Sequence, residues 1–112
     1  MIGIDLVEHK DIIDKDDKFV RRVLSDKEYE IYSNIKNKKR QIEYVASRFA
    51  SKEALFKACK KFPQHIDLKE ISILNDETTH SPYVYCEKLD CKLEISITHT
   101  DNYSVAFVIL LP

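Results

Sequence analysis

Glycine is nearly absent from this chain, with one residue in 112, and there are only three prolines. The sequence contains no internal repeat, linker or low-complexity segment, so its length predicts a single domain over residues 1–112. No apolar run approaches the roughly 18 residues that a membrane-spanning helix needs, and no signal peptide is apparent. We therefore expect neither a membrane partner nor secretion.

An excess of positive charge is also lacking. The 18 Lys and Arg residues are matched by 19 Asp and Glu residues, which gives a net charge of −1. Nucleic-acid-binding domains usually carry a strong basic excess, so we expect no nucleic-acid partner. The basic stretch Lys36–Arg40 leaves an RNA-binding loop as a rival hypothesis, but the sequence has no aromatic–basic stacking pattern. The three cysteines, Cys59, Cys86 and Cys91, form no CxxC pair and indicate reduced thiols of a cytoplasmic protein.

Strong helix formers, in contrast, are abundant in the segment Arg40–Lys61. This segment has no glycine or proline and predicts one long helix, which Phe62-Pro63 would end. Glu53 falls in the middle of an apolar arc on this helix, and Lys57 lies one turn further along its edge. The apolar members of the arc are Ile42, Val45, Ala46, Phe49 and Phe56.

The position of Glu53 allows two interpretations, because a carboxylate within an apolar stripe is costly unless it is compensated. In the first, Glu53 forms a partly exposed ion pair with Lys57, four residues later. In the second, Glu53 faces a cation in a cleft, while Arg48, Lys52 and Lys57 face an anion. Because Mg²⁺ usually takes one or two carboxylates plus substrate phosphates, the second arrangement suggests a phosphate-bearing ligand.

Asp5 is an acid inside the segment Met1–Glu8, whose alternating pattern predicts a strand. It shares one face with Gly3 and Val7, and the opposite face is apolar, with Ile2, Ile4 and Leu6. Because aspartate is depleted in strands, Asp5 either faces water from an edge strand or serves as a second metal carboxylate. Gly3 would let another element approach this strand closely.

Short helices are expected between this strand and the long helix. The segment His9–Lys18 alternates acids and bases and is either helical or irregular, and Phe19–Leu24 has apolar residues at helical spacing. Ser25 is a good N-cap, with Glu28 as its capping-box partner, for a helix through Tyr32. The polar residues that follow Tyr32 predict a loop.

The remaining third of the chain is rich in β-forming residues. Its strand candidates are Ile71–Leu74, Tyr83–Glu87, Leu93–Thr98 and Tyr103–Leu111. A turn at His99–Asn102 would join the last two strands as a hairpin. The order of elements predicts an α+β domain in which the long helix packs on a mainly antiparallel sheet.

His99 and Thr100, in this predicted turn, offer hydroxyl donors and one titratable ring. A histidine in a loop is most often only solvated. Ser96 and His99 do not predict a nucleophile pair, because neither an acidic partner nor a GxSxG context is present.

Three motifs occur in a recognisable order: GID at 3–5, RFASKEALFKA at 48–58 and SITHTDNYSVAFV at 96–108. Together they resemble the holo-acyl-carrier-protein synthase family, the small bacterial 4′-phosphopantetheinyl transferases. The likeness covers nearly the whole chain and implies the 4′-phosphopantetheinyl transferase fold. It also implies transfer of phosphopantetheine from coenzyme A to a serine of apo-acyl carrier protein, with release of 3′,5′-ADP, in fatty acid biosynthesis.

The resemblance further implies roles for individual residues. Asp5 and Glu53 match the magnesium ligands of the family, where the ion would grip the coenzyme A pyrophosphate. Lys57 matches a lysine that could stabilise the leaving phosphate. The substrate serine is the nucleophile, and its base is either Glu53 or a water on the metal.

Other residues would hold the remaining coenzyme A phosphates: Arg48, Lys52, His99 and Thr100. The resemblance also implies a trimer with each active site at a subunit boundary. Side chains of the long helix in one chain would then meet side chains of the hairpin in the next chain. Members of the family also carry a basic patch for the acidic carrier protein. Here Lys10, Lys18, Arg21 and Arg22 are diluted by Asp11, Asp14, Asp16 and Asp17, so partner steering should be weaker.

The chain departs from the family pattern at two places. Lys60–Pro63 stands where the family has a glycine-rich turn, and His80-Ser81-Pro82 stands where it has Gly-Lys-Pro. Either side-chain cations replace backbone contacts to the ligand, or coenzyme A binds more weakly. A non-catalytic coenzyme A- or nucleotide-binding module is therefore the alternative function.

Overall fold

The computed structural model describes residues 1–59 and 66–112. The first half of the chain forms strand β1 (Ile2–Glu8) and helices α1 (Lys10–Ile13), α2 (Asp17–Val23), α3 (Asp26–Ser33) and α4 (Lys38–Ala58). The second half forms the 3₁₀ helix η1 (Leu68–Glu70) and strands β2 (Ser72–Asn75), β3 (Pro82–Tyr85), β4 (Leu93–His99) and β5 (Tyr103–Leu110). The predicted helix end at Phe62-Pro63 lies outside the described residues.

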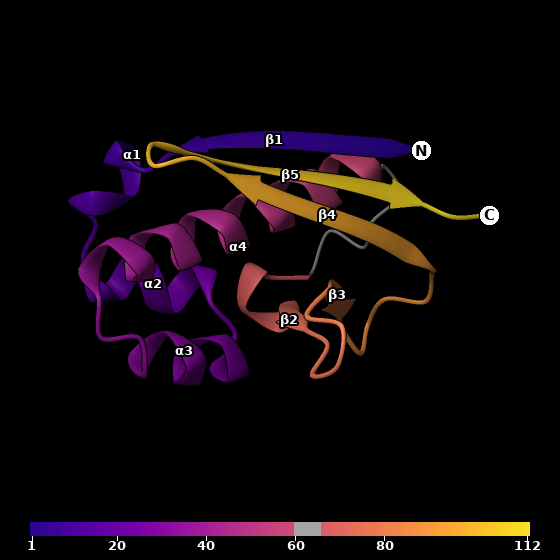
Figure 1. The fold of residues 1–112 in the computed structure, drawn as a ribbon. Coiled ribbons are helices and arrows are strands. Elements are labelled where there is room, and N and C mark those ends of the chain that lie inside the picture. The colour runs from indigo at the N-terminus through magenta and orange to yellow at the C-terminus, as the bar shows by residue number, and fades with distance from the viewer. Residues whose placement is uncertain (60–65) are drawn as a thin grey trace.

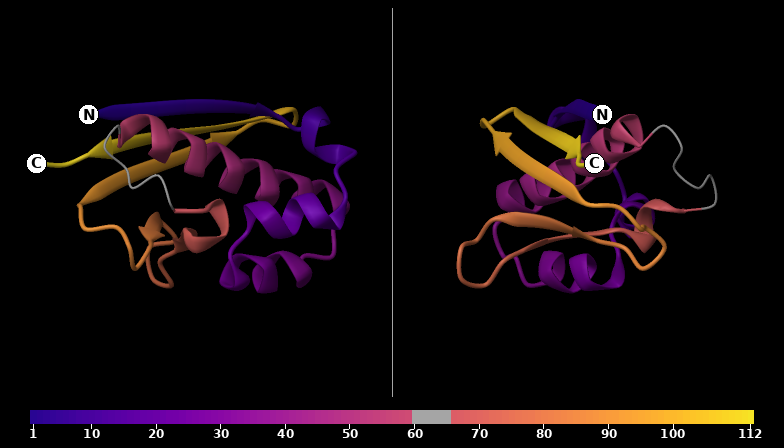
Figure 2. Two further views of the ribbon diagram at one scale, coloured as in Figure 1. Left: turned by 180° about the vertical axis from the view of Figure 1, so that it is seen from behind. Right: turned by 90° about the vertical axis from the view of Figure 1, so that its right-hand side faces the viewer.

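Two antiparallel sheets enclose the long helix. The larger sheet has the order β1-β5-β4, and β2 and β3 form a second, two-stranded sheet. The three-stranded sheet covers one side of helix α4. Helices α2 and α3 and the β2–β3 hairpin lie on the opposite side of α4 (Figures 1 and 2). This arrangement confirms the predicted α+β architecture with a long helix packed on an antiparallel sheet.

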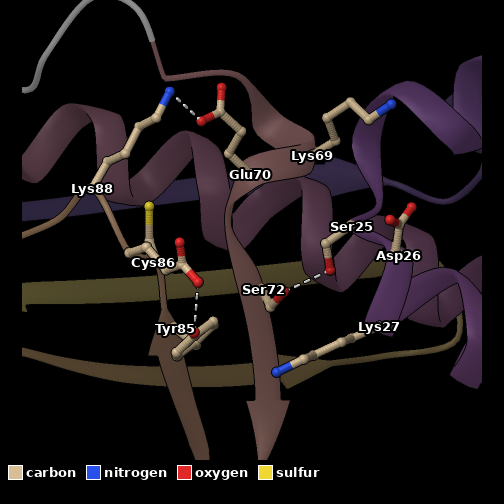
Figure 3. Close-up of a pocket in the computed structure, with 10 residues that line it drawn as sticks. Ser25, Asp26, Lys27, Lys69, Glu70, Ser72, Tyr85, Cys86 and Lys88 are labelled. Carbon is tan, nitrogen blue, oxygen red and sulfur yellow. Dashed lines mark hydrogen bonds and ion pairs between the residues drawn. The ribbon is translucent and has the colours of Figure 1, made fainter.

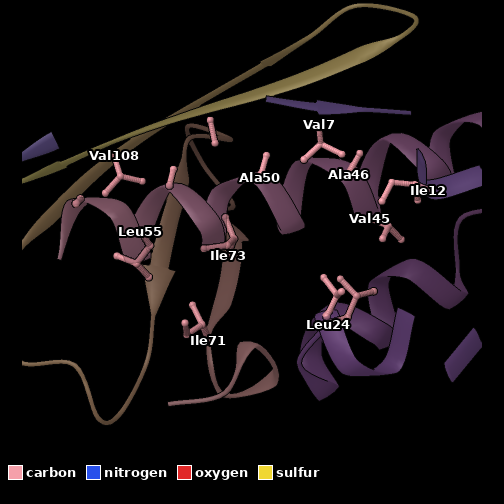
Figure 4. Close-up of a cluster of buried hydrophobic side chains, with 14 of the residues drawn as sticks. Val7, Ile12, Leu24, Val45, Ala46, Ala50, Leu55, Ile71, Ile73 and Val108 are labelled. Atoms are coloured by element: carbon pink, nitrogen blue, oxygen red, sulfur yellow. The ribbon is translucent and has the colours of Figure 1, made fainter. Parts of the chain in front are cut away.

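The middle position of α4 explains which of its side chains are buried. A row of alanines at i, i+4 spacing is fully buried: Ala46, Ala50, Ala54 and Ala58. Val45 and Leu55 are buried on the same helix and join Leu24, Ile71 and Ile73 in the core (Figure 4). The predicted arc covers only part of the buried surface: Val45 and Ala46 are in the core, whereas its other apolar members are partly buried and pack against the core, namely Ile42, Phe49 and Phe56. A helix covered on two sides has no single apolar stripe.

The helix starts follow capping chemistry. Ser25 and Glu28 form the predicted capping box, in which the Ser25 hydroxyl accepts from the Glu28 amide and the Glu28 carboxylate accepts from the Ser25 amide. Helix α4 begins two residues earlier than predicted because the Asn37 side chain accepts a hydrogen bond from the Arg40 amide. It ends at Ala58, with Cys59 as its C-cap.

The outer face of the larger sheet is apolar and exposed along β1 and β5, while β4 carries the polar residues Glu94, Ser96 and Thr98 on the same face. On β1, the exposed fractions are 63% for Ile2, 57% for Ile4 and 56% for Leu6. These residues pair across the strands with Ile109, Phe107 and Val105 of β5. Within the described residues, no helix is long and apolar enough to cross a membrane.

Candidate active site

The site begins at Gly3, where β1 lies against α4. A methyl group added at Gly3 would collide with the Ala54 carbonyl oxygen and would lie 2.8 Å from the Ala58 backbone nitrogen. The absence of a side chain therefore permits the close approach that the sequence predicted. Because side chains alternate along a strand, Asp5 points to the same side as Gly3. The strand thus presents Asp5 to the helix.

Asp5 and Glu53 lie near Lys57 at this contact. The Lys57 ammonium donates to Asp5 Oδ1 and to the Ile4 carbonyl oxygen, both at 3.0 Å. Burial raises the pKa of the Glu53 carboxyl, and the negative charge of Asp5 raises it further, while Lys57 opposes the shift. The structure therefore brings together the three residues that the sequence singled out, and it pairs Lys57 with Asp5.

A cavity of about 540 Å³ opens in front of these carboxylates. Asp5 and Glu53 line it together with the acids Glu8 and Asp11. No group of three or more His, Cys, Asp or Glu side chains within the described residues is arranged to hold a metal by itself. Two neighbouring carboxylates nevertheless fit Mg²⁺, since this ion commonly completes its shell with substrate phosphates and water.

Arg48 and His99 line a second cavity, of about 330 Å³. The Arg48 side chain is held by protein acceptors: Nε donates to the Ile73 carbonyl at 3.2 Å, and another nitrogen donates to Asn75 Oδ1 at 2.8 Å. Its guanidinium also lies 4.1 Å from the centre of the Tyr44 ring. Arg48 is only 7% exposed, yet it has no ion pair with a carboxylate in the described part of the chain. A buried cation of this kind suits an anionic ligand.

His99 and Thr100 have different roles in the β4–β5 hairpin. His99 is the last residue of β4 and lines the Arg48 cavity. Thr100 does not line it; its hydroxyl oxygen accepts from the amides of Asn102 and Tyr103, at 3.2 and 3.1 Å, and so closes the turn. The structure therefore brings Arg48 and His99 together and leaves Thr100 in a positioning role.

Lys52 requires a correction. Its predicted phosphate contact does not fit this structure, because the Lys52 side chain is completely buried. The ammonium donates to Glu28 Oε1 at 2.6 Å and to the carbonyl oxygens of Val23 and Leu68 at 2.6 and 2.9 Å. All three of its donors are thus used inside the protein. Burial lowers the pKa of Lys52, and the charge of Glu28 opposes that shift.

The sequence did not predict the roles of two residues: His9, which bonds to the β4–β5 hairpin, and Asn75, which lines the Arg48 cavity. The ring nitrogens of the buried His9 lie 2.9 Å from the Asp101 carbonyl oxygen and 2.8 Å from Ser104 Oγ, tying β1 to the β4–β5 hairpin. The available signal was the position of His9 directly after the strand that carries Asp5. Asn75 bonds to Arg48 from the end of β2, one residue beyond the predicted strand Ile71–Leu74.

A further cavity, between α3 and the β2–β3 hairpin, contains none of the predicted residues (Figure 3). Its charges are balanced: three lysines are matched by Asp26, Glu70 and Glu87. Lys88 is paired with Glu70 at 2.6 Å, and Lys27 lies over the Tyr85 ring. This cavity therefore has no excess charge that would attract a phosphate.

The fold and these two cavities are typical of a protein that binds a phosphate-bearing ligand: it is an α+β domain in which two carboxylates beside Lys57 line one cavity and a buried guanidinium lines the other. Comparison with known proteins makes this specific. The family model described as the 4′-phosphopantetheinyl transferase superfamily matches residues 1–108. The chain belongs to this superfamily.

Curated relatives and solved structures agree with that assignment. A holo-[acyl-carrier-protein] synthase of onion yellows phytoplasma is 48% identical, with 97% of this chain and 91% of the relative aligned. One from Anoxybacillus flavithermus is 39% identical over 97% of this chain and 92% of its own length. A crystal structure of a holo-(acyl-carrier-protein) synthase from Bacillus anthracis in complex with CoA (3′,5′-ADP) superposes with a TM-score of 0.87. It is 33% identical and covers 97% of this chain and 93% of that one.

Proposed function

We propose that this chain transfers 4′-phosphopantetheine from coenzyme A to a serine of apo-acyl carrier protein, giving holo-acyl carrier protein and 3′,5′-ADP for fatty acid biosynthesis. The observation that carries this proposal is the meeting of Asp5, Glu53 and Lys57 where β1 lies against α4, with both carboxylates lining one cavity, in a member of the superfamily. A module that only binds coenzyme A would not need paired carboxylates beside a lysine. The three free cysteines support a cytoplasmic location.

Magnesium is the proposed cofactor, with Asp5 and Glu53 as the protein's ligands. Bound there, the ion would supply positive charge against the coenzyme A pyrophosphate. The mutual repulsion of these two carboxylates supports the assignment, because a cation between them would relieve it. The replaced glycine-rich turn, Lys60–Pro63, lies outside the described residues, so its effect on the ligand remains a prediction.

The remaining site residues would neutralise the phosphate charges of coenzyme A and hold it in position. Lys57 offers an ammonium, 56% exposed, that can move from Asp5 to the leaving phosphate. Arg48 and His99 would hold another phosphate of coenzyme A in their cavity. No side chain of this protein has to act as nucleophile, because the carrier protein supplies the serine. The chain's task is therefore to orient two substrates and to balance charge.

A homotrimer with active sites at subunit boundaries completes the proposal. The carboxylate cavity and the Arg48–His99 cavity share no lining residue in one chain. A ligand that needs both groups would meet them where one chain's Glu53 lies beside the next chain's His99. The exposed apolar face of the larger sheet supports subunit contact, because an uncovered patch of this kind usually marks an interface.

The carrier protein would dock near α2. Lys10 is paired with Glu8 and Arg21 with Asp17, so these two cations are partly neutralised. Lys18 and Arg22 are exposed and form no salt bridge within the described chain. They are therefore the cations best placed to attract the acidic surface of a carrier protein.

Release of 3′,5′-ADP tests the reaction. We expect release only when coenzyme A, Mg²⁺ and apo-acyl carrier protein are all present, and none when the acceptor serine of the carrier is replaced by alanine. Removal of the metal with a chelator should stop release, and added Mg²⁺ should restore it. Release without the carrier protein would indicate hydrolysis and would contradict the proposed transfer.

A further inference from the structure

His80 has an unusual backbone conformation. Its φ of 63° lies in the left-handed region, and no other non-glycine residue does so in the described part of the chain. This region is costly for residues with a side chain, and glycine adopts it freely. A histidine here gives up backbone stability that glycine would provide, so its imidazole needs another explanation.

The turn around His80 is firmly built. Its amide donates to the Asp76 carbonyl at 2.8 Å, and its carbonyl accepts from Asn75 Nδ2 at 2.9 Å. The Asp76 carboxylate accepts from the amides of Thr78 and Thr79, at 2.8 and 2.9 Å, and these bonds lower the pKa of Asp76. The left-handed conformation is therefore held in place by its neighbours.

One side chain connects this turn to Arg48. The oxygen of the Asn75 amide accepts from the Arg48 guanidinium, while its nitrogen donates to the His80 carbonyl. His80 is consequently fixed relative to a cation that is 7% exposed and forms no ion pair within the described residues. Asn75 acts as a positioning residue between them.

The cavity that His80 and Arg48 share is biased toward anions. Arg40 and His99 also line it, and Glu43 is the one carboxylate among its described lining residues. The lining thus has two guanidinium groups and two imidazoles against one acid. An imidazole N–H next to a buried guanidinium is a good donor to a phosphate oxygen.

We propose that His80 is a further binding residue of this enzyme, whose imidazole donates a hydrogen bond to a phosphate of coenzyme A beside Arg48. The inference rests on the proposed function, since it takes coenzyme A as the ligand. The contact comes from a side chain that a glycine at this position would lack. It therefore gives this chain a ligand contact of its own, which depends on the left-handed turn.

The test compares His80→Gly and His80→Asn with the unmodified enzyme. Calorimetric Kd values for coenzyme A and for 3′-dephospho-coenzyme A are measured together with the kinetics of transfer. Both variants should raise the Kd and the KM for coenzyme A about 10-fold and leave kcat unchanged. The His80→Gly variant should be at least as resistant to urea as the unmodified protein, because glycine relieves the left-handed backbone. Thr78→Gly, a glycine in the same turn outside this cavity, is the matched control and should leave Kd unchanged.

The two ligands identify the phosphate. A loss confined to coenzyme A assigns the contact to the 3′-phosphate, and an equal loss for both ligands assigns it to the pyrophosphate. Unchanged Kd values in both variants, or a loss in kcat alone, would overturn the inference. If the unmodified protein binds coenzyme A without transferring phosphopantetheine, the proposed function fails, while the Kd comparison still decides the role of His80.

Discussion

At Gly3, the absence of a single methyl group decides how closely β1 lies to α4. The nearest atoms to an added Cβ belong to the backbone of Ala54 and Ala58, and backbone cannot swing aside as a flexible side chain can. Because Asp5 follows two residues later on the same face, any separation of strand and helix would also move Asp5 away from Glu53. The only glycine of the chain thus supports the site as well as the fold.

We predict that Gly3→Ala lowers the free energy of unfolding by about 1–3 kcal/mol, since strand and helix must separate to admit the methyl group. Urea denaturation followed by circular dichroism measures this change. The matched control is Glu94→Ala at an exposed position of β4, which should change stability by less than about 0.5 kcal/mol. Equal denaturation midpoints for Gly3→Ala and the unmodified protein would contradict the close approach.

At the scale of elements, a buried polar cluster joins the helices to the β2–β3 hairpin. Glu28, at the start of α3, accepts from Lys52 of α4 with one carboxylate oxygen and from the Ile73 amide of β2 with the other, at 2.6 and 2.7 Å. Ser72 Oγ donates to Ser25 Oγ at 2.6 Å in the same cluster. The cluster fixes how α3, α4 and β2 meet, and α4 carries Arg48 and Glu53.

We predict that Lys52→Met and Glu28→Gln each cost roughly 3–5 kcal/mol, because each leaves one partner of a buried ion pair unmatched. The double variant should cost clearly less than the sum of the two, which a double-mutant cycle in urea measures. Lys57→Met on the same helix is the control and should reduce transfer with little effect on stability. Additive costs would show that the pair is not coupled.

Much of the fold could be predicted because its signals are local. Alternation predicted β1 and β5, and Ser25 with Glu28 predicted the start of α3, since capping involves residues three apart. The pairing of Lys52 with Glu28 joins residues 24 positions apart, so helical spacing could not reveal it. The same limit applies to Asn75, which bonds to Arg48, and to His80, which is linked to Arg48 through Asn75. Asp5 and Glu53 could be proposed from the sequence because a carboxylate in an apolar segment is informative by itself.

In the whole molecule, an active site shared between two chains of a trimer would allow two inactive variants to complement each other. Glu53→Gln and His99→Ala should each be inactive alone, but mixed trimers made by joint refolding should recover activity. With equal amounts, each mixed trimer has one site with both native residues, so about a quarter of the original activity should return. Adding Leu6→Glu to both variants places a charge on the apolar sheet face and should prevent this recovery. No recovery in mixed samples that light scattering identifies as trimers would contradict shared sites.

The docking of the carrier protein can be tested through the exposed cations near α2. Reversing charge with Lys18→Glu and Arg22→Glu together should raise the KM for apo-acyl carrier protein about 10-fold and leave the KM for coenzyme A unchanged. The effect should shrink as salt is added, because screening weakens interactions between exposed charges. Lys36→Glu and Lys38→Glu together, at two other exposed positions, change the net charge by the same amount and are the control. An unchanged carrier KM would exclude this docking surface.

Covalent transfer of phosphopantetheine changes the mass of the carrier protein, which intact mass spectrometry measures. The protein is incubated with apo-acyl carrier protein, coenzyme A and Mg²⁺, with Glu53→Gln and a chelator-treated sample in parallel. We predict a mass gain of one phosphopantetheine in the complete reaction and none in either parallel sample. An unchanged mass for several carrier proteins, despite measurable binding of coenzyme A, would contradict the proposed transfer and favour a module that only binds coenzyme A.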